Sequence, residues 1–197
     1  MALEADSQLM LRVQEGDEES FATLLQRFRV PIWQFLHRMV QNQAVAEELA
    51  QEVFLRVYRS RATYEPSAKF STWLYRIATH LALNHLRDSK NDRGNISADE
   101  QTDEQAPLQL ASKDPSIEDR LLRAARAERI RGAIDALPEK QRLAVILHKY
   151  QELDYRQIGD LIGASESAVK SLLFRAYDTL RTRLADLAPT NATKLAG

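Results

Sequence analysis

Cationic and hydrogen-bonding side chains repeat at helical spacing in residues 70–87, which read FSTWLYRIATHLALNHLR. Arg76, His80 and Asn84 are four residues apart, so on a helix they form one row, with Trp73 beside it. Cations neutralise phosphates and flat rings stack on unpaired bases, so this combination is typical of a surface for single-stranded nucleic acid. The simpler alternative is a core helix with solvated arginines, and this segment alone favours that alternative.

The same segment has the pattern of an amphipathic helix. It contains no glycine or proline, and apolar residues recur in it every three or four positions. We expect a buried stripe of Phe70, Leu74, Ile77 and Leu81. On the opposite face, together with the polar row, we expect Thr72, Thr79, Leu83 and Arg87.

A second basic helix is predicted near the other end of the chain. Asp154 and Gln157 fit a capping box, Gly163 suits a tight turn, and Ser165 can cap the helix that follows. Two short helices joined in this way form a helix-turn-helix, whose second helix enters the major groove of DNA. Its expected exposed residues are Glu166, Ser167, Lys170, Ser171, Phe174 and Arg175. The alternative is a helical hairpin with a solvated face, and the agreement of cap, turn and basic face favours DNA binding.

The residue types needed for catalysis or metal binding are missing or badly spaced. The chain has no cysteine, which excludes disulfides and thiolate-ligated metals. His80 and His85 would lie about 140° apart around a helix, too far to share a metal. No glycine-rich phosphate loop or serine-nucleophile elbow occurs. We therefore expect no enzyme, no cofactor and no metal site.

The chain is expected to be all-α, because no segment alternates polar and apolar residues for long. Residues 91–118 carry two basic and seven acidic side chains, a net charge of −5, and few aromatics. This composition predicts a flexible acidic linker. We expect two small helical domains, 8–90 and 119–187, that tumble semi-independently, and a disordered tail at 188–197.

Within the first domain we expect three helices before residue 70. One begins at Asp6 or Ser7 and ends near Gln14. The next starts at Asp17 and is kinked or broken by Pro31. The third covers residues 44–59.

No targeting or membrane segment is apparent. The first residues are acidic where a signal peptide needs positive charge, and no apolar run approaches transmembrane length. We therefore expect a cytoplasmic protein without membrane insertion.

Three segments in this order resemble a bacterial RNA polymerase sigma factor. They are AEELAQEVFLRVYR at 46–59, FSTWLYRIA at 70–78 and LPEKQRLAVILHKYQELDYRQIGDLIGASESAVKSLLFRA at 137–176. The short chain without a middle domain is similar to the extracytoplasmic-function (ECF) group. The resemblance implies a sigma region 2 domain, a sigma region 4 helix-turn-helix domain, and a non-catalytic subunit that directs promoter-specific initiation. A helix-turn-helix regulator acting without polymerase is the alternative, and it leaves the first two segments unexplained.

The resemblance also implies roles for particular residues. Those expected at the promoter −10 element are Tyr64, Ser67, Lys69, Phe70, Thr72, Trp73, Arg76, His80 and Asn84. Those expected at the −35 element are Ser165, Glu166, Ser167, Lys170, Ser171 and Arg175. Those expected to bind the clamp helices of the largest polymerase subunit are Glu47, Glu48, Gln51, Glu52, Phe54 and Arg56. The other implied partners are the flap of the second-largest subunit and an anti-sigma factor.

The chain departs from the family pattern at two positions of the 70–87 helix. Leu74 stands where housekeeping relatives carry a second aromatic beside Trp73, and His80 stands where many ECF members have Asn. With one ring fewer, promoter opening should depend more on base capture by the 64–70 loop. In the recognition helix, Leu172 and Tyr177 replace arginines of many relatives, so fewer −35 contacts are expected.

Overall fold

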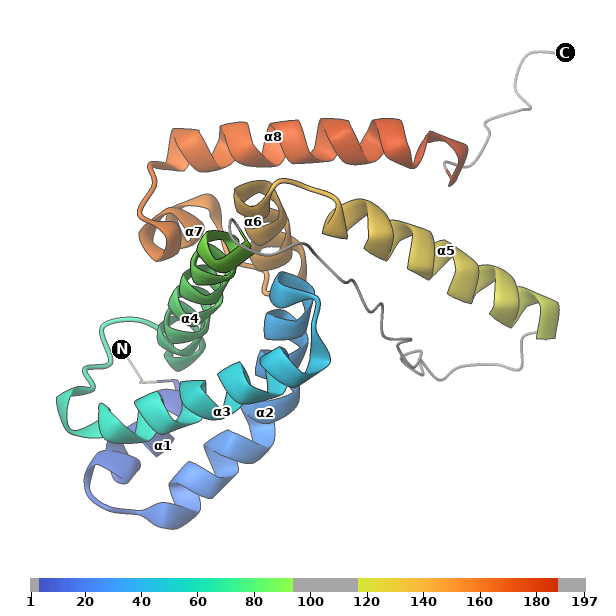
Figure 1. Cartoon of the computed structure of the whole chain (residues 1–197). Helices are drawn as coiled ribbons and strands as arrows, with labels where there is room; N and C mark the ends of the chain where they lie inside the picture. Colours follow the sequence, from blue (N-terminus) through green and yellow to red (C-terminus); the bar gives the residue numbers. More distant parts are fainter. Residues whose placement is uncertain (1–3, 94–116, 188–197) are drawn as a thin grey trace, which may run out of the picture.

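The described part of the chain is helical. The computed structural model describes residues 4–93 and 117–187, and within these ranges the chain forms eight α-helices, two 3-10 turns and no strand (Figure 1). The helices are α1 (Ala5–Gln14), α2 (Glu18–Val40), α3 (Gln43–Arg59), α4 (Phe70–Arg93), α5 (Ile117–Asp135), α6 (Glu139–Tyr150), α7 (Tyr155–Ile162) and α8 (Glu166–Arg183). The 3-10 turns are η1 (Arg61–Thr63) and η2 (Ala185–Leu187). The all-α prediction is confirmed.

Helices α1 to α4 pack around one apolar core. Leu24 of α2, Val53 of α3 and Leu74 of α4 are buried there, on the apolar faces of their helices. Asp17 and Asn42 cap α2 and α3 by accepting hydrogen bonds from the first free backbone N–H groups of each helix. Local capping signals and apolar periodicity therefore agree with the tertiary packing of this unit.

Two local features of this unit differ from the sequence prediction. Helix α2 continues through Pro31, so of the predicted kink or break the break does not occur, and Ile32 beside the proline is fully buried. Packing of the apolar face can compensate for the hydrogen bond that proline removes. Helix α1 begins after Glu4 rather than at Asp6 or Ser7, and Ser7 is buried instead of capping.

Helical structure enters the expected acidic linker from both sides. Helix α4 continues to Arg93, and α5 already begins at Ile117. The remainder of that linker, residues 94–116, lies outside the described residues, as does the tail at 188–197. The domain boundaries at residues 90 and 119 stay a prediction.

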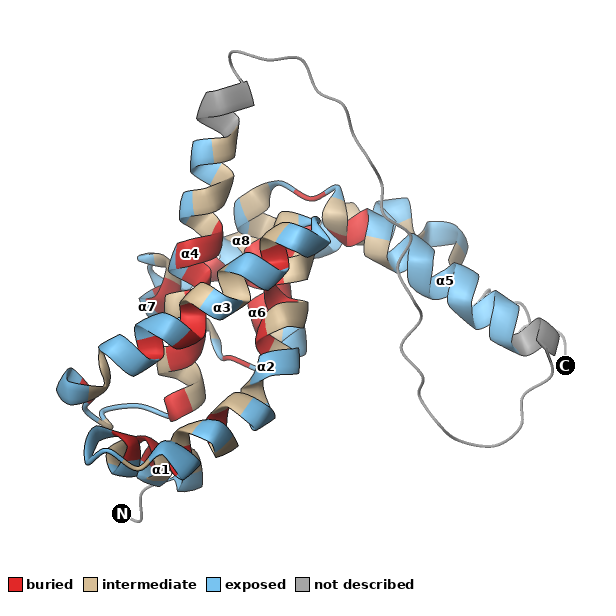
Figure 2. Ribbon diagram, turned by 60° about the horizontal axis from the view of Figure 1, so that its bottom comes forward, coloured by how far each residue is buried: buried red, intermediate tan, exposed pale blue. Residues whose placement is uncertain are grey.

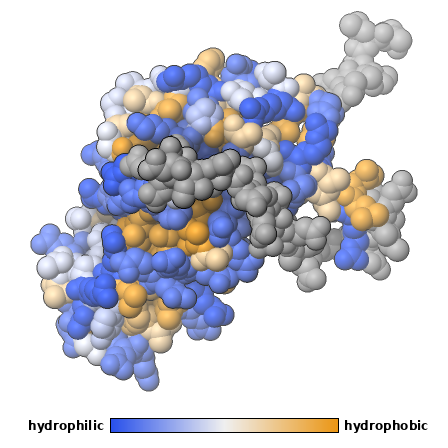
Figure 3. All heavy atoms as spheres, viewed as in Figure 1, coloured by the Kyte–Doolittle hydropathy of each residue, from blue (hydrophilic) through white to orange (hydrophobic). Residues whose placement is uncertain are grey.

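Helices α6, α7 and α8 surround a second set of buried side chains, among them Ile146, Ile158 and Leu173. Helix α5 extends away from them, and its outer end exposes Leu121 and Leu122, at 66% and 62% of their surface. Figure 3 shows an apolar patch at that end of the molecule. The second unit thus combines a compact three-helix body with a projecting helix that carries unburied leucines.

The two units contact each other. Arg142 of α6 is buried and donates one hydrogen bond to the carbonyl of Met39 in α2 and one to that of Asp135, both at 2.9 Å. Gln41 Nε2 also donates to the Asp135 carbonyl at 3.2 Å, and burial raises the pKa of the Asp135 carboxyl. Helix α4 packs against α7 at the same junction (Figure 2). The structure thus shows contacts between the two units, and their semi-independent tumbling stays a prediction.

Candidate nucleic-acid interface

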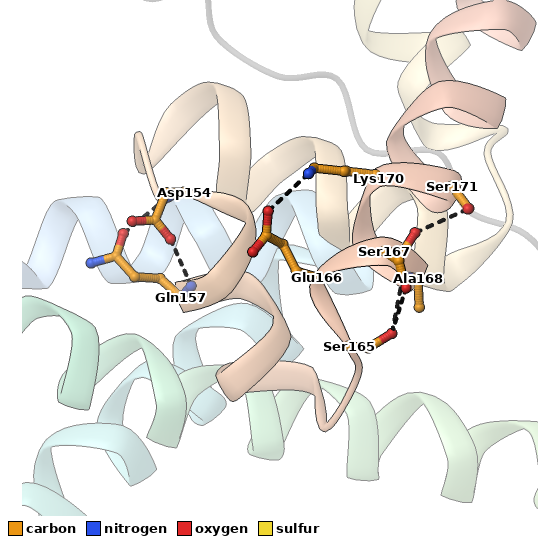
Figure 4. A network of polar contacts seen from close by, with 8 residues as sticks. All are labelled: Asp154, Gln157, Ser165, Glu166, Ser167, Ala168, Lys170 and Ser171. Atoms are coloured by element: carbon orange, nitrogen blue, oxygen red, sulfur yellow. Dashed lines mark hydrogen bonds and ion pairs between the residues drawn. The ribbon is translucent and has the colours of Figure 1, made fainter.

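The helix-turn-helix predicted from capping signals is present. The Asp154 carboxylate accepts from the backbone N–H of Gln157 at 2.8 Å, and Gln157 Oε1 accepts from that of Asp154 at 2.9 Å (Figure 4). Gly163 ends α7 with a φ of +67°, which glycine adopts without a steric penalty. Ser165 Oγ accepts from the N–H of Ala168 at 3.2 Å and starts α8. These contacts fix the beginning of α8 beside α7.

The exposed face at the start of α8 carries all the predicted −35 residues. Ser165, Glu166, Ser167, Lys170, Ser171 and Arg175 are all exposed. Lys170 Nζ pairs with Glu166 at 2.9 Å, and the hydrogen bond and charge of that carboxylate raise the pKa of Lys170. Arg175 Nε donates to the carbonyl of Ser171 at 3.2 Å. One helical face therefore presents two cations and several hydroxyl groups.

Phe174 belongs to this surface; the helical pattern placed it on the exposed face, but the −35 residues implied by the resemblance did not include it. It is 72% exposed and lines an open hollow together with Lys170, Ser171 and Arg175. Its position four residues after Lys170 was the available signal. An apolar side chain among cations can contact the methyl group of thymine in the major groove.

The aromatic residues at the start of α4 divide into buried and accessible ones. Tyr64 and Phe70 are 3% and 0% exposed, so neither offers a ring face to a base. The Tyr64 ring lies 4.9 Å from that of Trp73, and the Phe70 ring lies 5.9 Å from it, between centroids. Trp73 is half-buried and lines an open hollow of the surface with Arg56 and Arg59. Of these three rings, Trp73 is the one with accessible surface.

The polar row of α4 faces solvent as expected. The exposed members of the predicted −10 set are Ser67, Lys69, Arg76, His80 and Asn84. Thr72 is half-buried, and its hydroxyl has no hydrogen-bond partner among the described residues. Thr79, which was expected on the open face, is fully buried, so that expectation is wrong. The accessible polar surface is the row of Arg76, His80 and Asn84 together with the end of the preceding loop.

Helix α3 presents a second candidate surface, for protein rather than nucleic acid. Glu47, Glu48 and Gln51 are exposed as predicted. Glu52 is half-buried and pairs with the exposed Arg56 at 2.7 Å, while Phe54 is only 9% exposed and packs in the core. The sequence reasoning missed Leu55 and Tyr58, which are 49% and 36% exposed on this helix. Apolar residues at outward positions of an amphipathic helix were the signal, and the α3 face is therefore mixed acidic and apolar.

The described residues offer neither a metal site nor a membrane span. No group of three or more histidine, aspartate or glutamate side chains within 4–93 and 117–187 could hold a metal ion. No helix of the described residues is long and apolar enough to cross a membrane. Among these residues, the surfaces on α3, α4 and α8 are the ones that the sequence patterns and the geometry select together.

Each of the two units matches the model of a known family. Residues 24–92 match the family model of sigma-70 region 2, and residues 127–180 match that of sigma-70 region 4. The first match includes the row on α4, and the second includes the helix-turn-helix. Helix α1 lies before the first matched segment.

Relatives match this chain over most of its length. The chain is 32% identical over 178 residues to the ECF RNA polymerase sigma factor SigW of Bacillus subtilis, covering 89% of this chain and 95% of that one. It is 35% identical to the RNA polymerase sigma factor CarQ of Myxococcus xanthus, over 90% and 97% of the two chains. Among solved structures, the sigma factor RpoE in complex with the anti-sigma factor NepR from Bartonella quintana matches with a TM-score of 0.70 and 18% identity. That match covers 85% of this chain and 98% of the other, and it concerns the fold alone.

Proposed function

This chain belongs to the sigma-70 family of RNA polymerase sigma factors, in its ECF group, and we propose how its surfaces divide the work of promoter recognition. It is a transcription initiation factor and not an enzyme. In our proposal the α8 face reads the −35 element as duplex, and the α4 row reads the −10 element as an unpaired strand. The observation that carries the proposal is the presence of two separate cationic faces, one of them beside an accessible tryptophan.

The α8 assignment follows from the chemistry of the major groove. Arginine and lysine donate to guanine or to phosphate, serine donates to either, and a carboxylate accepts from cytosine. Lys170 is already paired with Glu166, but exposed pairs of this kind contribute little, so exchange for DNA costs little. Arg175 and Lys170 are therefore assigned the main −35 contacts.

The α4 assignment combines stacking with strand contacts. In the proposal, Trp73 stacks on the base pair at the edge of the melted region, and Arg76, His80 and Asn84 contact the separated strand. Tyr64 and Phe70 are assigned a positioning role in this proposal, since their rings pack against Trp73 and are buried. Ser67 and Lys69 lie exposed at the end of the 64–70 loop, which is proposed to capture a base.

The α3 face is proposed to bind core polymerase. Its acidic residues Glu47 and Glu48 suit a basic partner surface, and the exposed Leu55 adds the apolar contact that stable interfaces usually contain. The expected partner is the clamp-helix pair of the largest subunit. The second unit is expected to contact the flap of the second-largest subunit.

We also propose an anti-sigma partner and a cytoplasmic location. The structurally similar RpoE was solved with the anti-sigma factor NepR, and CnrH was solved with the cytosolic domain of CnrY. Leu121 and Leu122 of α5 offer such a partner an exposed apolar surface. A cytoplasmic location follows from the proposed binding to core polymerase.

His80→Ala tests the assignment of the α4 row. We expect about tenfold fewer open complexes on duplex promoters, because a polar contact to the separated strand is lost. The loss should be much smaller on templates that are already unpaired at −10. Permanganate reactivity of unpaired thymines measures promoter opening on both kinds of template.

Binding to core polymerase and to −35 duplex should be unchanged in the same variant, because His80 lies on neither surface. Equal loss on both templates would indicate a general folding defect. Parent-like opening on both would mean that His80 is only a solvated side chain, and would move −10 reading to the loop alone.

A further inference from the structure

The first helix of the chain is tied to the segment that leads into α4. Gln14 Nε2 donates to the carbonyl of Ala62 at 2.8 Å, near the start of that segment. Glu4 Oε2 accepts from the backbone N–H of Phe70 at 3.1 Å, at its end. A third bond, in the middle, joins two buried hydroxyl groups, since Tyr64 donates to Ser7 Oγ at 3.2 Å. Helix α1 thus fastens the start, middle and end of one loop.

These three bonds join residues that are 48 to 66 positions apart in sequence. Helix α1 is itself well anchored, because Met10 and Val13 are buried and Asp6 forms an ion pair with Arg27 of α2. The loop carries Ser67 and Lys69 on its exposed side. A loop held in one conformation before binding loses less entropy when it captures a ligand.

We propose that α1 is a brace that holds the 61–69 loop in its base-capturing conformation, with Gln14 and Glu4 as positioning residues. The inference rests on the proposed −10 role of that loop. It assigns a task to a helix that lies outside the segment matched by the sigma region 2 family model. Neither residue needs to touch DNA, because each acts through the backbone of the loop.

Gln14→Glu is the first test, made in holoenzyme assembled from the full chain and core polymerase. The change keeps the shape of the side chain but replaces the donor to Ala62 with a carboxylate that cannot donate. We expect about 3- to 10-fold fewer open complexes on a duplex promoter, as the loss of one hydrogen bond allows, and a smaller deficit on a template already unpaired at −10. Gln14→Lys restores a donor and should recover most of the activity.

The matched control is Gln26→Glu, which makes the same charge change at an exposed position of α2. It should open promoters like the parent. Since Gln14 and Gln26 are both exposed, the midpoint of thermal unfolding should stay within about 2 °C of the parent in both variants. Core binding and −35 duplex binding should also be unchanged.

A second pair of variants repeats the test at the other end of the loop. Glu4→Ala removes the acceptor for the Phe70 N–H, whereas Glu4→Gln keeps an amide oxygen there. The brace predicts a defect in promoter opening for the alanine variant and recovery in the glutamine variant. Equal opening by the parent, Gln14→Glu and Glu4→Ala would overturn the brace, and so would a defect that the donor- or acceptor-keeping variants share.

Lys69→Ala separates failure of the brace from failure of the −10 assignment. If Lys69→Ala impairs opening while Gln14→Glu and Glu4→Ala do not, the brace is wrong and the loop still reads DNA. If none of the three affects opening, the loop has no −10 role, and the brace falls with it.

Discussion

Gly159→Ala is expected to destabilise the helix-turn-helix unit by about 1–3 kcal/mol and to reduce −35 binding at least tenfold. A Cβ built on Gly159 would lie 2.5 Å from the carbonyl oxygen of Ala164. That oxygen belongs to the backbone of the turn, so it cannot move aside as a flexible side chain would. Either the turn opens or α7 shifts, and in both cases the start of α8 loses its position beside α7.

Gly132→Ala is the matched control for this prediction. It lies within α5, where a Cβ would meet nothing within 4 Å. Alanine should therefore stabilise that helix by about 0.5–1 kcal/mol. Urea unfolding followed by circular dichroism, with gel-shift titration of a −35 duplex, measures both variants. A Gly159→Ala variant as stable as the parent would mean that the close approach in the turn is not a real constraint.

Arg175→Ala is expected to weaken −35 duplex binding by about 1–3 kcal/mol, which is about 5- to 150-fold. The guanidinium is exposed on the α8 face, and its backbone contact to Ser171 leaves other N–H groups free to donate. If it contacts a base, specificity should relax at one position of the element. If it contacts a phosphate, binding to all sequences should weaken alike, and the slope of log affinity against log salt concentration should fall by about one.

Arg181→Ala is the matched control. Arg181 is also exposed on α8, but it lies nearly two helical turns beyond Arg175, further from the start of the helix. It should bind −35 DNA like the parent, whereas Lys170→Ala should show a deficit of the same kind as Arg175→Ala. Titrations at several salt concentrations separate the base and phosphate cases. Parent-like binding by both the Lys170 and Arg175 variants would show that the recognition face has been assigned to the wrong residues.

The parts of the structure that depend on local pattern could be predicted from the sequence. Apolar periodicity located the helices, and the Asp154–Gln157 capping box with Gly163 located the helix-turn-helix. These signals are local because a cap or a left-handed turn involves residues only a few positions apart. The polar row of Arg76, His80 and Asn84 was equally readable, since four-residue spacing alone places its members on one helical face.

The parts of the structure that depend on contacts between distant segments could not be predicted from the sequence. Tyr64 and Phe54 are aromatic residues of the kind found in binding surfaces, yet tertiary packing buries them. The cap on α4 comes from Glu4, 66 positions away, which no local pattern contains. The contact between Arg142 and the Met39 carbonyl likewise joins segments 103 positions apart, and no local pattern in the sequence indicates it.

The most direct test of the central claim is run-off transcription with purified core polymerase on fragments of genomic DNA, with sequencing of the RNA 5′ ends. With the chain added, we expect discrete start sites that share a common −10 and a common −35 sequence and are absent with core polymerase alone. The Arg175→Ala chain should reduce initiation at those starts, and the Arg181→Ala chain should not. Start sites identical with and without the chain would contradict the assignment of promoter recognition to these two surfaces.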